Sequence, residues 1–387
     1  MKLLIRNGKV LTMAGTEYEK GCVLVEQGKI LRVAEHIEET ADTEVIDAAG
    51  GIIMPGIIDA HCHIGISEQD MYEGDDDTNE ATDPVTPHLR AIDAINPMDS
   101  AFGDAVKGGI TGVMTGPGSA NVIGGQFVFM KTKGTSVDDM VVLEPAALKI
   151  AFGENPKRVY SEQKKTPSTR MGVAALLRDS LTAAVNYKKK KENKLNDFEK
   201  DLKKEAFLPV LEGKIPLKTH AHRADDILTA IRIAKEFQVK LTLDHCTEGH
   251  YISEYIKEAG YPAIVGPSLT GRSKMELKHL SFKTPGVLAK AGIPIAIATD
   301  HPVIPIQYLP ICAGLAVRES EGFEVTQALK AITINAAEIC GVADRVGSLE
   351  PGKDADIAIF DGNPLEVMTR VRYTIINGKI AYAQDSN

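Results

Sequence analysis

The stretch Pro55-Gly56-Ile57-Ile58-Asp59-Ala60-His61-Cys62-His63 decides both the fold and the chemistry that this chain predicts. An apolar run leads into a His-x-His pair. Successive side chains of a strand point to opposite faces, so His61 and His63 share one face. Two imidazoles on one face at the end of a buried strand are half of a metal site. The rest of the chain must then supply the other ligands.

Four more ligand candidates follow at wide spacing, each at the end of a strand-like apolar run: Lys149, His220, His245 and Asp300. In barrels of parallel strands, the carboxyl ends of the strands are where enzymes place their chemistry. Lys149 lies in Ala-Leu-Lys-Ile-Ala-Phe, where a buried lysine is costly unless it is paired or modified. A carbamylated Lys149 would bridge two metals. The alternative is an unmodified lysine whose head reaches the surface.

The middle of the chain, roughly residues 56–346, alternates strand-like and helix-like segments. Buried parallel strands are short apolar runs, and we predict them at residues 51–58, 112–115, 147–151, 216–220, 240–244, 263–265 and 293–299. Amphipathic helical patterns lie between several of them, as at 224–237 and 252–259. About eight such units predict a (β/α)8 TIM barrel. A doubly wound open sheet is the alternative, but no Gly-x-Gly-x-x-Gly follows the first strand to favour it.

Both ends of the chain have a different character, with short β-type pieces separated by turns such as Asn7-Gly8 and Asn377-Gly378. We therefore predict two domains. Residues 1–55 together with 347–387 form a small β-sandwich from both termini, and residues 56–346 form the metal-dependent hydrolase barrel.

Composition limits the classes of partner. The chain has 387 residues, a formal net charge of −9 and five cysteines without a Cys-x-x-Cys spacing. No basic face is evident, which argues against nucleic acid and anionic membrane as partners. The cysteine pattern fits a reducing compartment, and the first residues lack a signal-peptide pattern. We expect a cytoplasmic protein that acts on a small-molecule substrate and forms a homo-oligomer.

The motifs together resemble the amidohydrolase superfamily, in its imidazolonepropionase-related branch, over the whole chain. Residues 55–63 resemble the strand-one signature, and Gly347 to Asp356 resembles the return into the small β domain. Lys149 falls where binuclear members carry the modified lysine. His220 and His245 match the histidines of strands five and six, and Asp300 matches the aspartate of strand eight.

This resemblance implies hydrolysis of a C–N bond in an amide, a cyclic amide or a dipeptide-like molecule by a metal-activated water. The implied ligands are His61, His63, Lys149, His220, His245 and Asp300, holding one or two divalent metals per chain. Zinc is the first expectation, with Fe, Mn, Co or Ni as alternatives. Asp300 would also be the catalytic base and acid.

Two departures from the family pattern keep alternatives open. Mononuclear deaminases and imidazolonepropionase carry a catalytic Glu three residues after the strand-five His, and this chain has Arg223 there. Glu144 and Glu154 lie within reach of the metal-bridging role assigned to Lys149. The rival hypotheses are a mononuclear deaminase-like hydrolase with unmodified Lys149, and a non-catalytic scaffold with the amidohydrolase fold.

Four residues near the ligands are predicted to bind substrate: His222, Arg223, Arg272 and His301. Arginine suits bidentate binding of a carboxylate, so a substrate with a free carboxylate is expected. The alternative is that each arginine forms an ordinary salt bridge within the protein and does not bind substrate. A glycine-rich stretch at residues 116–125 is predicted to be a loop, either beside the ligand or in a tight turn.

Overall fold

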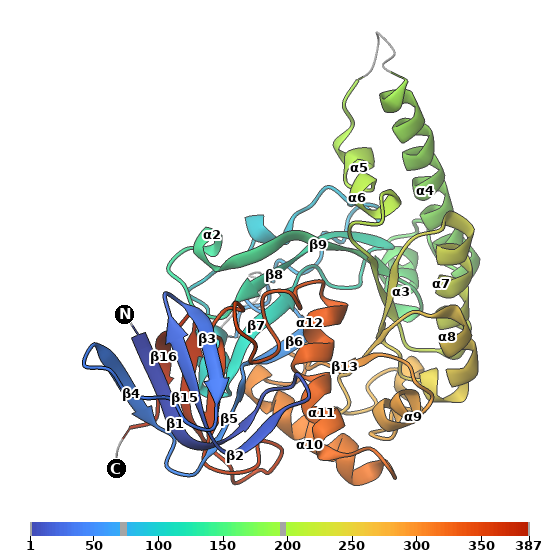
Figure 1. Cartoon of the computed structure of the whole chain (residues 1–387). Helices are drawn as coiled ribbons and strands as arrows, with labels where there is room; N and C mark the ends of the chain where they lie inside the picture. Colours follow the sequence, from blue (N-terminus) through green and yellow to red (C-terminus); the bar gives the residue numbers. More distant parts are fainter. Residues whose placement is uncertain (1, 70–75, 194–198, 386–387) are drawn as a thin grey trace.

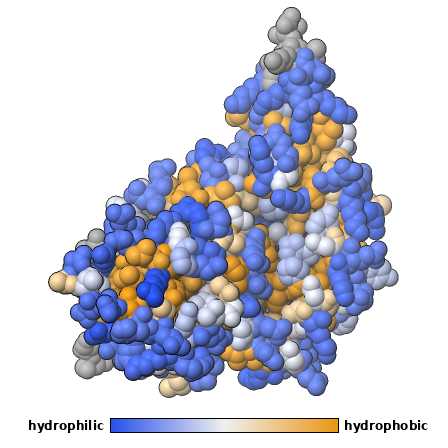
Figure 2. Space-filling view, in the orientation of Figure 1, coloured by the Kyte–Doolittle hydropathy of each residue, from blue (hydrophilic) through white to orange (hydrophobic). Residues whose placement is uncertain are grey.

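The computed structural model describes residues 2–69, 76–193 and 199–385. It contains two eight-stranded sheets, one at each side of the molecule: a barrel sheet that most of the helices surround, and a second sheet (Figure 1). Figure 2 shows hydrophilic residues over most of the visible face.

Eight strands form the barrel sheet in the order β13-β12-β11-β10-β9-β8-β7-β6. Their bounds are β6 Ile57–Cys62, β7 Ile110–Thr115, β8 Ile123–Lys131, β9 Val141–Ala151, β10 Leu217–Ala221, β11 Leu241–His245, β12 Ala263–Val265 and β13 Ile295–Ile297. The two end strands meet where the N–H of Asp300, just after β13, donates to the His61 carbonyl of β6 (3.1 Å). Each predicted barrel strand overlaps an observed one. This largely parallel eight-stranded barrel confirms the predicted TIM-barrel class.

One part of the barrel departs from strand–helix alternation. β8 pairs antiparallel with both β7 and β9, and the remaining barrel pairs are parallel. The glycines of residues 116–125 predict only a loop, yet β8 begins inside that stretch at Ile123. Its residues from Phe127 onward are buried, and packing on both faces stabilises a strand despite Gly124 and Gly125.

Helices cover the outside of the barrel (Figure 1). They are α1 Ser100–Lys107, α2 Val137–Met140, α3 Glu154–Glu162, α4 Arg170–Glu192, α5 Leu202–Glu205, α6 Leu208–Leu211, α7 Ala224–Phe237, α8 Ser253–Ala259, α9 Thr284–Lys290, α10 Leu309–Glu319, α11 Val325–Ala331 and α12 Ile334–Ile339. Four 3₁₀ turns are η1 Ala91–Asp93, η2 Gly249–Tyr251, η3 Met275–Leu277 and η4 Ile306–Tyr308. α4, α5 and α6 project as an arm. None of the helices in the described part of the chain has the length and apolarity to span a membrane.

The second sheet joins both ends of the chain, as predicted. Its order is β16-β15-β14-β5-β1-β2-β3, with β4 beside β1. The strands are β1 Lys2–Leu11, β2 Glu17–Glu26, β3 Lys29–Ala34, β4 Thr43–Asp47, β5 Ile52–Pro55, β14 Ile357–Phe360, β15 Val371–Ile376 and β16 Lys379–Ala383. The single strand expected over residues 51–58 is in fact two strands, β5 in this sheet and β6 in the barrel. Gly56 lies between them, and it has no room for a side chain, because a Cβ there would lie 2.1 Å from Thr111 Oγ1.

A buried ion cluster fastens the barrel to the second sheet. Lys131, at the end of β8, contacts Asp356 and, at 3.0 Å, Asp354 Oδ2. Arg345 (2.8 Å) and Lys29 (2.6 Å) also contact Asp354. Lys131, Asp354 and Asp356 are each less than 5% exposed. The ion pairs therefore compensate charges that water does not reach.

We expect Lys131→Met to destabilise the protein by about 3 kcal/mol, because it leaves buried Asp356 without a cation, whereas Asp354 keeps Arg345 and Lys29. The measurement is the denaturant midpoint and slope of both variants. Lys133→Met, at an exposed position two residues further on, is the control and should unfold like the wild type. Equal midpoints for Lys131→Met and Lys133→Met would contradict this account of the cluster.

Candidate metal centre

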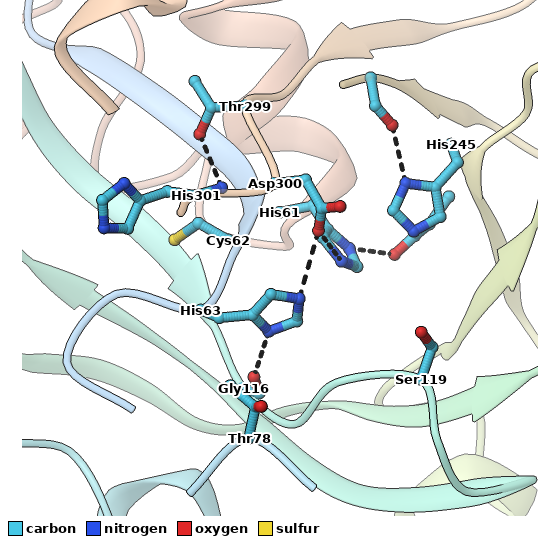
Figure 3. Close-up of polar contacts among 12 residues, drawn as sticks. His61, Cys62, His63, Thr78, Gly116, Ser119, His245, Thr299, Asp300 and His301 are labelled. Atoms are coloured by element: carbon cyan, nitrogen blue, oxygen red, sulfur yellow. Dashed lines mark hydrogen bonds and ion pairs between the residues drawn. The ribbon is translucent and has the colours of Figure 1, made fainter. Parts of the chain in front are cut away.

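The structure brings the six predicted ligands together at the carboxyl ends of the barrel strands: His61 in β6, His63 just after it, Lys149 in β9, His220 in β10, His245 in β11 and Asp300 just after β13. Lys149 Nζ lies 3.3 Å from His61 Nε2. Asp300 Oδ1 lies 3.4 Å from His61 Nε2 and 3.2 Å from His63 Nε2 (Figure 3). The rings of His220 and His245 are 4.5 Å apart between centroids.

Three of the histidines are held in one tautomer. Each Nδ1 faces an oxygen that can only accept, so Nδ1 carries the proton and Nε2 keeps its lone pair. The pairs are His61 with Asp244 Oδ2 (2.6 Å), His63 with the Gly116 carbonyl (2.7 Å) and His245 with the Gly266 carbonyl (2.7 Å). The free Nε2 atoms of His61 and His63 are those that lie beside Asp300.

Unsatisfied atoms at the centre fit a metal. His220 Nε2 and Asp300 Oδ1 are buried without a hydrogen-bond partner, which is costly unless a cation binds there. One ligand atom each from His61, His245 and Asp300 lie within 4.8 Å of one another, and so do those of His220, His222 and His245. Imidazole nitrogens and a carboxylate are the donors that zinc and related divalent metals take.

The backbone around the ligands is locally strained. His245 (φ 70°) and Asp300 (φ 55°) both adopt left-handed conformations that side-chain-bearing residues rarely take. Such strain persists only where neighbouring contacts hold it. Next to Asp300, Thr299 donates through its N–H (3.2 Å) and its hydroxyl to the buried carboxylate of Asp59. Burial raises the pKa of Asp59 to about 7.

Lys149 is fully buried and lies 5.5 Å from the centre of the Phe127 ring. Burial lowers the pKa of Lys149 from its ordinary value to about 8. The two rival carboxylates take other partners. Glu144 pairs with Arg90 (2.8 Å), and Glu154 accepts the backbone N–H of Glu276 (3.0 Å). Of the three residues considered for the bridging role, Lys149 is the one that contacts a predicted ligand in the described structure.

Burial also sets the charge of the other ligands. It lowers the pKa of His61, His220 and His245 well below the usual value, so these imidazoles are neutral and available as ligands. Burial alone would raise the pKa of Asp300, but His245, His63 and Lys149 nearby lower it. Asp300 is therefore ionised at neutral pH.

The four predicted substrate residues lie in different places. His222 is buried, stacks on His245 and pairs through Nδ1 with Thr247 Oγ1 (2.8 Å). His301 is buried with both ring nitrogens unpartnered, and its ring points away from Asp300 (Figure 3). Arg223 forms an exposed fork with Asp225, and exposed Arg272 donates to the Leu280 carbonyl (3.4 Å). The structure does not bring either arginine to the cavity at the ligands, because these partners hold them outside it.

That cavity has a volume of about 310 Å³ and is lined by five of the predicted ligands, by His222 and by polar loop residues. A larger cavity of about 570 Å³ lies at the opposite strand ends, near Pro216 and Pro262, away from the ligands. The sequence did not identify Lys274 and Glu276 as residues near the site, because their segment has no hydrophobic periodicity and no motif. Asp244 had a signal, since it stands as a carboxylate in the apolar run before His245.

Asp244→Asn should weaken metal binding by about 10- to 100-fold, the usual effect of losing a carboxylate that orients a ligating histidine. Asp244 accepts from His61 and also pairs with buried Lys218 (3.0 Å). Titration of the holoprotein with a competing chelator measures the affinity. Asp179→Asn, on the exposed side of α4, is the control. An unchanged affinity in Asp244→Asn would remove Asp244 from the account of the site.

Comparisons with known proteins show which family and structures the chain is similar to. The family model described as the amidohydrolase family matches residues 52–381. A solved amidohydrolase from Thermotoga maritima MSB8 is 46% identical, with 99% of this chain and 100% of that chain covered and a TM-score of 0.95. Imidazolonepropionase from Thermoplasma volcanium is 26% identical over 92% of this chain and 90% of the relative.

Another relative is longer than this chain. Amidohydrolase tasK from Hapsidospora irregularis is 28% identical over 377 residues, which is 90% of this chain. The match spans 38% of the length of that protein.

Proposed function

The chain belongs to the amidohydrolase family, whose members hydrolyse carbon–nitrogen bonds, and on that premise we propose that it cleaves a small amide, cyclic amide or dipeptide-like molecule at a two-metal centre. The observation that carries the proposal is the convergence of Lys149, Asp300 and four histidines at one end of the barrel. The branch is the one related to imidazolonepropionase. Arg223 at the place of the catalytic Glu argues against that reaction itself.

We assign His61, His63 and Asp300 to one metal and His220 and His245 to the other, with Lys149 between them. Divalent metals bound there, zinc in the first instance, would polarise the scissile carbonyl and lower the pKa of a bound water. In its carbamylated form, Lys149 would help to hold both metals. Its neutral amine adds to carbon dioxide, forming an N–C bond and releasing one proton. Its lowered pKa supports this, because the neutral amine is more abundant than in an exposed lysine.

Asp300 moves the proton. Its ionised carboxylate takes a proton from the attacking water as the C–O bond forms. It then gives that proton to the leaving nitrogen as the C–N bond breaks, yielding a carboxylic acid and an amine. The Nε2 lone pairs of His61 and His63 lie 3.4 and 3.2 Å from the Asp300 carboxylate, an arrangement that a cation held by these three residues would stabilise. His222 lines the cavity beside them and is proposed to bind substrate, whereas His301 lies outside that lining.

The remaining proposals concern the whole molecule. We propose that the second sheet folds as a β-sandwich around the apolar cluster that includes Ile5, Val23, Ile53 and Ile357. The domain boundaries proposed are those predicted, with residues 1–55 and 347–387 apart from 56–346. A homo-oligomer in the cytoplasm stays a prediction.

A substrate screen tests the proposed function. Metal-reconstituted protein is assayed against N-acyl amino acids, dipeptides, lactams and cyclic ureides, with product amine as the readout. We expect turnover in at least one class, its loss on chelation and its return with metal. Turnover that persists after the metal is removed would overturn the proposal. So would deamination of nucleosides with no amide cleaved, which supports the deaminase-like rival.

A further inference from the structure

We infer that Lys274 anchors the substrate of this site and selects amides that carry a carboxylate close to the scissile bond. The inference rests on the proposed function and names its substrate class. Lys274 lies in the loop between β12 and η3 and lines the cavity that holds the metal ligands. Among the described residues lining that cavity, Lys149 and Lys274 are the lysines, and no arginine is present. Lys149 is assigned to the metals, which leaves Lys274 for a substrate.

The ammonium of Lys274 is held next to His220 of β10 and His222, which follows that strand. Its Nζ lies 2.6 Å from Glu276 Oε1. The same oxygen faces His220 Nε2 (3.6 Å) and His222 Nε2 (3.7 Å). The Glu276 side chain is 1% exposed, whereas that of Lys274 is 25% exposed. Buried Glu276 therefore positions the ammonium of Lys274, which stays accessible to a ligand in the cavity.

Two reciprocal hydrogen bonds between the start of α3 and η3 fix this arrangement. The N–H of Glu276 donates to Glu154 Oε2 (3.0 Å), and the N–H of Glu154 donates to Glu276 Oε2 (3.0 Å). The next residue, Asn155, contacts Lys274 Nζ through Oδ1 (3.4 Å) and donates to Ser119 Oγ (2.8 Å). A group held in this way loses little conformational entropy when a ligand binds, which favours binding.

The donors of Lys274 match an anionic oxygen. An ammonium has three N–H donors. Asn155 accepts from Lys274 and Glu276 forms an ion pair with it, so at least one N–H donor is left for a ligand in the cavity. The cavity is small, about 310 Å³, and its lining is largely polar, including Ser67, Thr78 and Thr270. The arginines expected to bind a carboxylate lie outside this lining, so Lys274 takes that role. A carboxylate near the amide fits the short reach from Lys274 to His220.

Matched substrate pairs test the inference. N-acetyl amino acids and the corresponding N-acetyl amino acid amides are assayed with wild type, Lys274→Met and the exposed control Lys278→Met, all metal-reconstituted. In wild type we expect a higher kcat/KM for the acids. In Lys274→Met, KM for the acids should rise by about 10- to 100-fold, the value of a hydrogen bond to a charged group. The loss for the amides in Lys274→Met should be smaller than the loss for the acids, and all kinetics of Lys278→Met should match wild type.

A loss of the same size for acids and amides in Lys274→Met, or no loss for either, would overturn the inference. Calorimetry measures the binding of N-acetylglycine, N-acetylglycinamide and inorganic phosphate. It tests the inference about Lys274 independently of the proposed function. If none of these compounds is hydrolysed, selective binding of N-acetylglycine that disappears in Lys274→Met still supports Lys274. Equal binding of N-acetylglycine and its amide by wild type would contradict the proposed role of Lys274. Tighter binding of phosphate would contradict a carboxylate as the group that Lys274 recognises.

Discussion

Asp300→Asn keeps its fold and its metals and loses turnover by about 10²–10⁴-fold, the range that a positioned acid–base group contributes. Asparagine is similar in size to aspartate and its amide oxygen can still act as a ligand, but it cannot accept the water's proton. Asp300 follows β13 in a strained conformation that Thr299 and Asp59 hold, and neither contact uses the Asp300 carboxylate. We therefore expect the variant to fold, because these contacts do not depend on the charge of the Asp300 carboxylate.

The measurement is kcat on whichever substrate the screen identifies, together with circular dichroism and metal content of the same sample. Asp138→Asn, at an exposed position in α2, controls for the change of charge. Wild-type turnover in Asp300→Asn would defeat the assignment. Loss of metal along with activity would show that Asp300 acts as a ligand more than as a base.

Lys149→Ala should bind fewer metals per chain than wild type and lose most activity, because no carbamate then bridges the two sites. Small carboxylates such as formate or acetate, added at high concentration, should restore part of the metal content and turnover. They can occupy the space vacated by the lysine and supply the missing oxygens. Lys235→Ala, exposed on α7, is the matched control.

The rescue is the informative part of this experiment. A lysine that only packs against Phe127 would leave a cavity when removed, and acetate would not restore metal binding. Full metal content and turnover in Lys149→Ala without added carboxylate would contradict the bridging role and favour a mononuclear site.

The sequence predicted which residues lie together at this end of the barrel, because each candidate ligand carries a local signal. His61 and His63 alternate on one strand, and His220, His245 and Asp300 each end an apolar run. The topology of a barrel then brings strand ends together without any knowledge of the loops. The same reasoning located all seven predicted strands, since buried parallel strands have a continuous apolar pattern.

The features that sequence could not predict depend on contacts far apart in the chain. β8 follows a glycine-rich stretch, and its pairing with β7 and β9 comes from packing rather than from local preference. Lys274 reaches the cavity because Glu276 meets Glu154, a contact across 122 positions. Arg223, beside a predicted ligand in sequence, turns outward to Asp225. Loop geometry, which sets specificity, therefore had to come from the structure.

The most direct test of the two-metal account is the number of metal ions per chain, measured by elemental mass spectrometry. The protein is purified without chelator and with bicarbonate present, so that Lys149 can be carbamylated. The account predicts close to two divalent metals per chain, with zinc the first expected. A ratio close to one would contradict the bridging role of Lys149, and no metal after reconstitution would contradict the catalytic centre as a whole.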